Sequence, residues 1–203
     1  MENRTVILAA GDFPRKGGAA WELLAAAKRV VACDSAANAY RRRFRKWPDA
    51  IVGDLDSVSG LSPHVSCPTS LVRVPDQETN DLEKAMTYCA QQGWRDPVIV
   101  GATGKREDHA IGNVFRALDY GCEIVTDTGR FIPVRGKAAL KARKGAAVSI
   151  FAPDPKTRMK SKGLAWTLDA VRFRNLHCAT LNRATASRVT LTSTKPVSVY
   201  IES

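Results

Sequence analysis

The 203-residue chain contains no apolar run long enough to cross a bilayer. Its longest runs, such as Thr5 to Ala10 and Val98 to Ala102, fall far short of the roughly 20 residues that a transmembrane helix requires. The start, Met1 to Arg4, leads into a short β-like run and lacks the long apolar core of a signal peptide. We therefore expect no membrane segment.

Cysteine is scarce and scattered. There are five cysteines, an odd number, and none forms a C-x-x-C pair (Cys33, Cys67, Cys89, Cys122 and Cys178). This pattern argues against a disulfide framework and against a zinc site, and it favours a reducing compartment. The expected location is cytoplasmic.

Acidic residues are scarce in the C-terminal part of the chain only. Residues 127–203 hold 15 Lys and Arg against four Asp and Glu, whereas residues 1–126 hold 16 of each. This step in charge predicts two domains, 1–126 and 127–203. A basic domain suits nucleic acid, an anionic small molecule or simple solubility. Because the cations are not interleaved with aromatic residues, nucleic-acid binding is not favoured.

The two parts also differ in hydrophobic periodicity. Strands are expected at Thr5–Ala10, Val30–Cys33, Ala50–Val52, Leu71–Val74, Val98–Val100 and Glu123–Thr126, and helices at Trp21–Lys28, Ala36–Phe44, Leu82–Gln91 and Ala110–Tyr120. This βαβα order predicts an α/β domain with a mainly parallel sheet and helices on both faces. Later runs are short and rich in Val, Ile, Thr and Phe, and they predict an all-β sandwich (Phe131–Val134, Ala147–Phe151, Val171–Phe173, Arg188–Thr192 and Val197–Ile201).

Two carboxylates, Asp54 and Asp56, follow the third expected strand after Gly53. On an extended backbone, residues two apart point to the same face. Such a pair at the carboxyl end of a strand can hold Mg²⁺ beside substrate phosphates. The alternative is a polar turn that closes the strand, and the pair alone does not decide between them.

The next strand end leads into a helix that begins near Asp81. Asp81 and Lys84 are three residues apart, which places a carboxylate for metal beside an ammonium for phosphate. A capping box formed by Asn80 and Glu83 is also expected here, and it leaves Asp81 and Lys84 free to act.

The fifth expected strand runs into a segment with two glycines and two cations, Gly101 to Arg106. A helix follows, and its N-terminal N–H groups suit a phosphate. Asp108 is a candidate N-cap of that helix, and His109 and Asn113 share one of its faces. The spacing required for a P-loop is absent.

In this order, the motifs resemble those of the thiamine pyrophosphokinase family. They are D-x-x-x-N (Asp34 to Asn38), P-D-x-I-x-G-D-L-D-S (Pro48 to Ser57), D-Q-x-x-x-D-x-x-K-A (Asp76 to Ala85) and G-A-x-G-x-R-x-D-H-x-x-x-N (Gly101 to Asn113). Gly163 to Trp166 and Asn182 are similar to segments of the family's second domain. The chain departs from the family pattern at Ser35-Ala36, Lys105, Leu181 and Arg183.

The resemblance implies Mg²⁺-dependent transfer of a diphosphoryl group from ATP to thiamine, giving thiamine diphosphate and AMP. It also implies a nucleotide-binding α/β domain, a β-sandwich, and a homodimer with thiamine between the subunits. The implied site residues are Asp54, Asp56 and Asp81 for Mg²⁺ and catalysis, Lys84 and Arg106 for phosphates, Asp34, Asn38, His109 and Asn113 for ATP, and Trp166 and Asn182 for thiamine. Asp81 and Asp108 are the candidate general bases.

Two alternatives from other classes stay open on the residues alone. A Mg²⁺ phosphatase of the D-x-D-x-[ST] type also uses paired carboxylates, but its nucleophile normally follows the first strand, and here the pair follows the third. A basic nucleic-acid-binding module would bind with steep salt dependence, and it leaves the clustered carboxylates unexplained.

Overall fold

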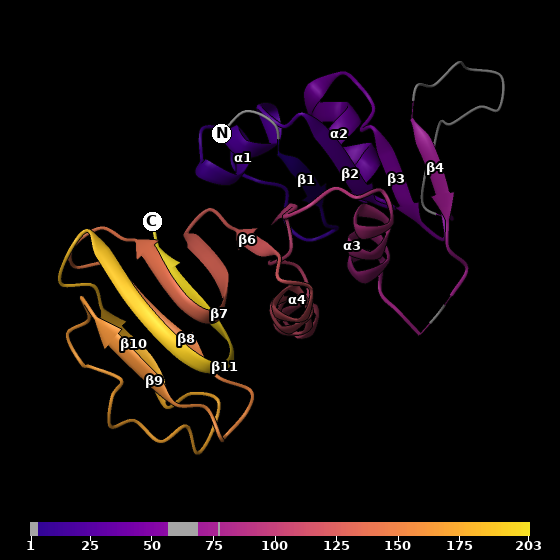
Figure 1. Cartoon of the computed structure of the whole chain (residues 1–203). Coiled ribbons are helices and arrows are strands. Elements are labelled where there is room, and N and C mark those ends of the chain that lie inside the picture. The colour runs from indigo at the N-terminus through magenta and orange to yellow at the C-terminus, as the bar shows by residue number, and fades with distance from the viewer. Residues whose placement is uncertain (1–3, 57–68, 77) are drawn as a thin grey trace, which may run out of the picture. The chain divides into compact units, whose positions relative to one another are not determined.

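The computed structural model describes residues 4–56, 69–76 and 78–203 (Figure 1). The chain divides into two compact units, one of residues 1–116 and 125–127 and the other of residues 117–124 and 128–203. Ser57 and Gln77 of the sequence motifs lie outside the described residues. The domain boundary at residue 126 remains a prediction.

The first unit contains a parallel sheet with the strand order β5-β1-β2-β3-β4. The strands are β1 (Thr5–Leu8), β2 (Arg29–Cys33), β3 (Ala50–Gly53), β4 (Ser70–Arg73) and β5 (Val98–Val100). The helices are α1 (Ala19–Ala25), α2 (Ala36–Phe44), α3 (Asp81–Gln91) and α4 (Glu107–Tyr120), the last of which continues into the second unit. The α/β domain predicted from the sequence is confirmed.

The central strands of this sheet are buried along their whole length, which explains their nearly continuous apolar sequences. On one face, Val6 and Leu8 of β1 pack with Leu24 of α1 and Tyr40 of α2. Helix α3 contacts β1, β2 and β3 but contributes no residue to that cluster. Helices α1 and α2 therefore pack in one cluster on the sheet, and α3 packs outside that cluster. The loops at the carboxyl ends of the strands form the candidate site.

The starts of two helices are informative. Asn80 caps α3 as expected, because its side chain accepts a hydrogen bond of 2.9 Å from the backbone N–H of Glu83. Helix α4 begins at Glu107, so the alternative role of Asp108 as its N-cap does not apply: Asp108 lies within the first turn. In the described part of the chain, no helix has both the length and the apolar character needed to span a membrane.

The second unit is built from antiparallel strands. They are β7 (Gly129–Lys141), β8 (Ala147–Phe151), β9 (Met159–Lys162), β10 (Ala179–Arg183) and β11 (Arg188–Glu202), while the residues of β6 (Glu123–Val125) are divided between the two units. One edge of β11 pairs with β7 along its length, and the other edge pairs first with β9 and then with β8. Inward residues of these strands form one apolar core. The β-rich second domain is therefore confirmed.

Two sequence-based expectations for this unit are wrong. Residues 171–173 form no strand; Phe173 is instead a fully buried core side chain in an irregular segment. The two runs expected at Arg188–Thr192 and Val197–Ile201 form one strand, with a register shift between Ser193 and Val197. Pro196 interrupts the apolar pattern there, which made one bulged strand read as two.

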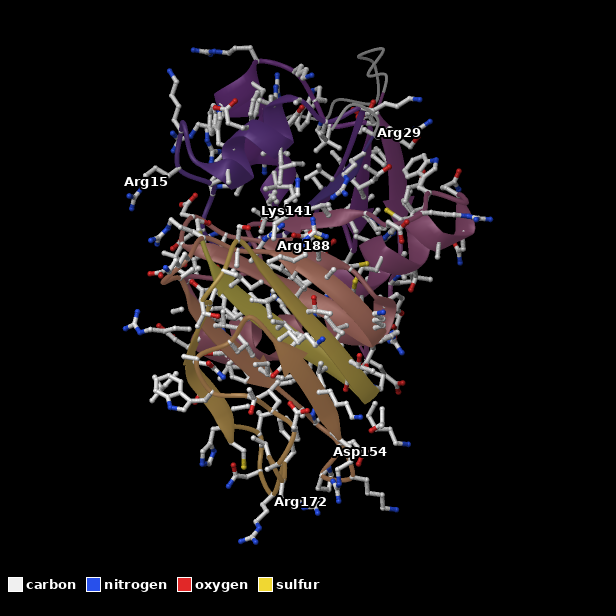
Figure 2. The ribbon with its side chains drawn as sticks, turned by 60° about the vertical axis from the view of Figure 1, so that its left-hand side comes forward. Arg15, Arg29, Lys141, Asp154, Arg172 and Arg188 are labelled. Atoms are coloured by element: carbon white, nitrogen blue, oxygen red, sulfur yellow. The ribbon has the colours of Figure 1, made fainter. Side chains whose placement is uncertain are left out.

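The outward face of β7, β9 and β11 carries a group of cations. Cross-strand partners share a face, and Arg188 lies opposite Lys141 (Figure 2). On the same face, Thr192 lies between Lys137 and Lys160. The intervening residues, such as Val189 and Leu191, point into the core. Part of the positive charge of the second unit thus gathers on one solvent-facing surface of the sheet.

Candidate active site

A cleft of about 390 Å³ lies at the carboxyl edge of the parallel sheet in the first unit. Its walls come from the residues after β1, β2, β3 and β5 and from the first turns of α3 and α4. The lining side chains that carry charge or polar groups are Cys33, Asp54, Thr79, Asn80, Asp81, Lys84, Lys105, Arg106, His109 and Asn113. Ligands of open α/β sheets bind in this position.

An unsatisfied carboxylate lies next in sequence to Cys33, a lining residue on the acidic side of the cleft. Asp34 follows β2 with a φ of 31°, is 6% exposed, and its buried Oδ1 has no hydrogen-bond partner among the described residues. Gly53 permits this packing, because a side chain there would press on Asp34 Cβ at 2.8 Å. A buried polar atom without a partner is costly, so Asp34 is positioned as if for a ligand.

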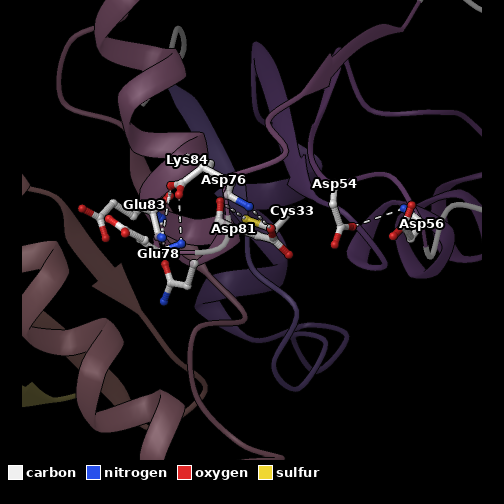
Figure 3. A network of polar contacts seen from close by, with 10 residues as sticks. Cys33, Asp54, Asp56, Asp76, Glu78, Asp81, Glu83 and Lys84 are labelled. Carbon is white, nitrogen blue, oxygen red and sulfur yellow. Dashed lines mark hydrogen bonds and ion pairs between the residues drawn. The ribbon is translucent and has the colours of Figure 1, made fainter.

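Asp81, the first residue of α3, lies beside Lys84 and Cys33 (Figure 3). Its carboxylate is 3.6 Å from the buried ammonium of Lys84. Burial raises the pKa of Asp81; Lys84 opposes this shift, and the negative charges of Asp34 and Asp54 add to it. Two carboxylates therefore repel that of Asp81 at this edge, an arrangement that a cation relieves.

Cys33 is fully buried under this group, and its thiol donates to the backbone carbonyl of Asp81 at 3.5 Å. Burial first, and then the negative charge of Asp81, raises the pKa of Cys33 well above its usual value. The thiol is therefore neutral and acts as packing beneath the cleft.

Asp54 and Asp56 do not share a strand face, so that part of the sequence argument is wrong. Strand β3 ends at Gly53, and Leu55 has a φ of 67°, which turns the chain between the two carboxylates. Asp54 lines the cleft, whereas Asp56 is exposed and donates its backbone N–H to Asp54 Oδ1 at 3.2 Å. Figure 3 shows this contact.

The described residues contain no group of three or more His, Cys, Asp or Glu side chains arranged to hold a metal ion by themselves. The carboxylate of Asp81 nevertheless lies close enough to Asp34 and Asp54 to be affected by the charge of each. Mg²⁺ is usually bound through one or two carboxylates together with phosphates and water. The donor set on this side of the cleft therefore fits Mg²⁺ that arrives with a phosphorylated ligand.

The basic side of the cleft includes Arg106, which forms an ion pair with the exposed Asp108 at 2.6 Å. The hydrogen bond from Arg106 lowers the pKa of Asp108 to about 2. A carboxylate with so low a pKa is a weak proton acceptor. Asp108 therefore orients Arg106 and is poorly suited to be a general base.

His109 and Asn113 of α4 line the cleft, as the sequence predicted for one helical face. Asn113 is buried and is already engaged: its amide donates to Ala102 O at 2.9 Å and accepts from Asn80 at 3.2 Å. It thus ties the start of α3 to α4 and to the chain after β5. His109 is exposed at the mouth of the cleft.

A second hollow, of about 450 Å³, adjoins the cleft, and Asn38 lies in its wall. Its other residues include Phe13, Ser35, Arg42, Arg43 and Lys105, and the two cavities share Ala9, Ala10, Gly11 and Lys105. The sequence motifs predict no role for the wall from Ala9 to Gly11 or for the two arginines. The basic run at the end of α2 is the signal in the sequence that points to the arginines.

In the second unit, Trp166 is 62% exposed, so it is not a core aromatic. Asn182 is buried, and its side chain bonds to both the N–H and the carbonyl of Trp166. The neighbouring Leu181 is 85% exposed with a φ of 65°. Trp166 and Leu181 thus expose apolar side chains, and the hydrogen bonds of Asn182 fix the backbone of Trp166.

The fold and the cleft are those of an enzyme class that binds phosphorylated ligands at the carboxyl ends of parallel strands. Residues 20–125 match the family model of the thiamin pyrophosphokinase catalytic domain, and residues 129–200 match that of its substrate-binding domain. The chain belongs to the thiamin pyrophosphokinase family. The reaction of this family is the ATP-dependent diphosphorylation of thiamine. Membership of the family therefore does not favour the phosphatase or the nucleic-acid-binding alternative.

Individual relatives agree. The chain is 27% identical to thiamin pyrophosphokinase 1 of Caenorhabditis elegans over 196 residues, 87% of this chain and 79% of that one. The fold is similar to that of a thiamin pyrophosphokinase family protein of Enterococcus faecalis (TM-score 0.78, 16% identity, 98% of each chain). It is also similar to thiamin pyrophosphokinase of Candida albicans (TM-score 0.73, 16% identity, 98% of this chain and 89% of that one).

Proposed function

We propose that this chain transfers the diphosphoryl group of ATP to the primary alcohol of thiamine at the cleft of the first unit, with Mg²⁺ and with AMP as the second product. The observation that carries the proposal is the pairing of opposite charges in one cavity. Asp54 and Asp81 line it together with Lys84 and Arg106. Carboxylates suit a divalent cation, and the cations suit the phosphates it accompanies.

Asp54, Asp56 and Asp81 are the proposed ligands of Mg²⁺, and the unpartnered oxygen of Asp34 supports a cation at this edge. When bound, the ion would neutralise charge on the phosphate oxygens. Lys84 supplies a fixed positive charge, because it is buried and already held by Asp81.

The remaining residues position the nucleotide. Arg106, oriented by Asp108, reaches the phosphates; Asp34, Asn38, His109 and Asn113 are the proposed ATP-binding residues. Asp108 is too acidic to take the hydroxyl proton efficiently. Asp81 is the other candidate general base.

Thiamine is proposed to stack on Trp166, because an exposed indole attracts a cationic aromatic ring. Asn182 acts by fixing the backbone of Trp166. A homodimer with thiamine between the subunits, and a cytoplasmic location, are further parts of the proposal.

The test is to incubate the purified protein with ATP, thiamine and Mg²⁺ and to quantify all products. Equal amounts of AMP and thiamine diphosphate are expected, and none after chelation of the metal. ADP with thiamine monophosphate would contradict the assigned reaction. Release of phosphate from a simple phosphomonoester would instead support the phosphatase reading.

A further inference from the structure

The cleft and the second hollow form two neighbouring cavities of the first unit with one side chain between them. Lys105 lines both, as does the segment from Ala9 to Gly11. Each cavity, of about 390 and 450 Å³, lies within the range of small-ligand pockets. A ligand with two chemically different parts can therefore place one part in each cavity. The bond between the two parts would then lie beside Lys105.

The loops that form this junction are held firmly. Gly11 N–H donates to Gly101 O and Asp12 N–H donates to Thr103 O, both at 2.8 Å. A side chain at Gly104, where φ is 79°, would overlap the side chain of Asp12. The backbone that carries Lys105 is thus fixed against the loop after β1.

Lys105 itself has a φ of 56°, a left-handed conformation that disfavours residues other than glycine. Its ammonium donates to Ala10 O at 2.7 Å. Within the described residues it has no acidic partner, and an ammonium has three donors. A backbone position that favours glycine therefore carries a lysine whose ammonium uses one of its three N–H donors on Ala10 O.

We propose that Lys105 binds the α-phosphate of the donor nucleotide, with the nucleoside in the second hollow and the β- and γ-phosphates in the cleft. The proposal rests on the proposed function, in which AMP is the leaving group. The two cavities differ in the way that this ligand requires. The cleft holds the carboxylates and Lys84, whereas the second hollow has no carboxylate among its described lining residues and offers Phe13, Ser35 and Asn38 beside the two arginines of α2.

The position of this cation matters for the chemistry. The thiamine hydroxyl oxygen forms a bond to the β-phosphorus and loses its proton to a base. The bond from the β-phosphorus to the oxygen shared with the α-phosphate breaks, and its electron pair stays on that oxygen as part of AMP. Negative charge therefore grows on the α-phosphate, where a fixed ammonium stabilises it.

The decisive measurement compares two ligands that differ by one phosphate, AMP and adenosine, by calorimetry on the intact protein. In Lys105→Met, the affinity for AMP should fall about tenfold, the scale of one hydrogen bond to a charged group, while the affinity for adenosine stays within twofold. Lys105→Arg should retain most of the AMP affinity. Lys28→Met, an exposed lysine of the same unit just before β2, should change neither.

Each other outcome is informative. Equal losses for AMP and adenosine would make Lys105 a structural tie to Ala10, and no loss for either would remove it from the site; both overturn the proposal. Lys105→Gly removes the unfavourable φ, so it should keep or raise the melting temperature while it weakens AMP, which separates binding from stability. The wild-type product assay is independent: ADP there would contradict the proposed function without altering the AMP-to-adenosine comparison.

Discussion

Asn182 holds the backbone of Trp166 from two sides. Its Oδ1 accepts a hydrogen bond from the Trp166 N–H at 3.2 Å, and its Nδ2 donates to the Trp166 carbonyl at 2.7 Å. The amide is buried, while the indole is 62% exposed. A polar group in the interior therefore fixes an aromatic group on the surface, and each residue can be tested separately.

Trp166→Ala should weaken thiamine binding and leave ATP binding unchanged. A desolvated contact between an indole and a cation contributes about 2 kcal/mol, which corresponds to a rise of about thirtyfold in the Kd of thiamine. Titrations of both ligands measure this, with Trp166→Phe expected to be intermediate. Equal weakening of both ligands would count against a thiamine-specific role.

Asn182→Ala should also weaken thiamine binding, but through Trp166. Removing the amide leaves two backbone groups of Trp166 without their partner, so the free energy of unfolding should fall by about 1–3 kcal/mol. A double-mutant cycle with Trp166→Ala decides the mechanism. Losses that add would mean that Asn182 contacts thiamine itself, whereas non-additive losses support positioning.

Asp54→Asn and Asp56→Asn should both fold normally and lose most activity, because each deletes the charge of a proposed metal ligand while keeping its size. Asp54 lines the cleft, whereas Asp56 is exposed and donates its backbone N–H to the side chain of Asp54. Asp54→Asn should therefore lose more activity and need a higher Mg²⁺ concentration for half-maximal rate. Steady-state rates against Mg²⁺ concentration measure this. Near-normal turnover of Asp56→Asn at the native melting temperature would remove Asp56 from the site.

Asp108→Asn should raise the KM for ATP and change kcat little, because Asp108 orients Arg106. Arg106→Met is the matched variant, and it should raise the same KM at least as much. A general base contributes about 10²–10⁴ in rate. A kcat that falls by that factor in Asp108→Asn, with KM unchanged, would restore Asp108 as the base.

Much of the fold was predictable, because α/β strands buried on both sides have short continuous apolar sequences and the helices between them are periodic. The second unit was harder. Met159–Lys162 alternates buried and exposed residues over only four positions, too few to distinguish a strand from a loop. Phe173 lies in the core without belonging to a strand, and apolar character alone cannot show that.

The residue types predicted which side chains gather in the candidate site, since Asp54, Asp81, Lys84, Arg106 and His109 all line the cleft; their roles stay predictions. Its details depend on backbone turns that the sequence does not reveal. The left-handed Leu55 separates Asp56 from Asp54, and the left-handed Lys105 faces both cavities. Leucine and lysine rarely adopt a left-handed backbone conformation, so the sequence does not predict it at either position.

The last strand, β11, is also the central one of its unit, where it joins β7, β8 and β9. It contributes five core residues (Val189, Leu191, Val197, Val199 and Ile201). Strands β7, β8 and β9 therefore cannot close around a common core until β11 is in place between them. Order in this unit depends on its last strand to a degree that no single earlier strand matches, because each of the others pairs over a shorter stretch or along one side of β11.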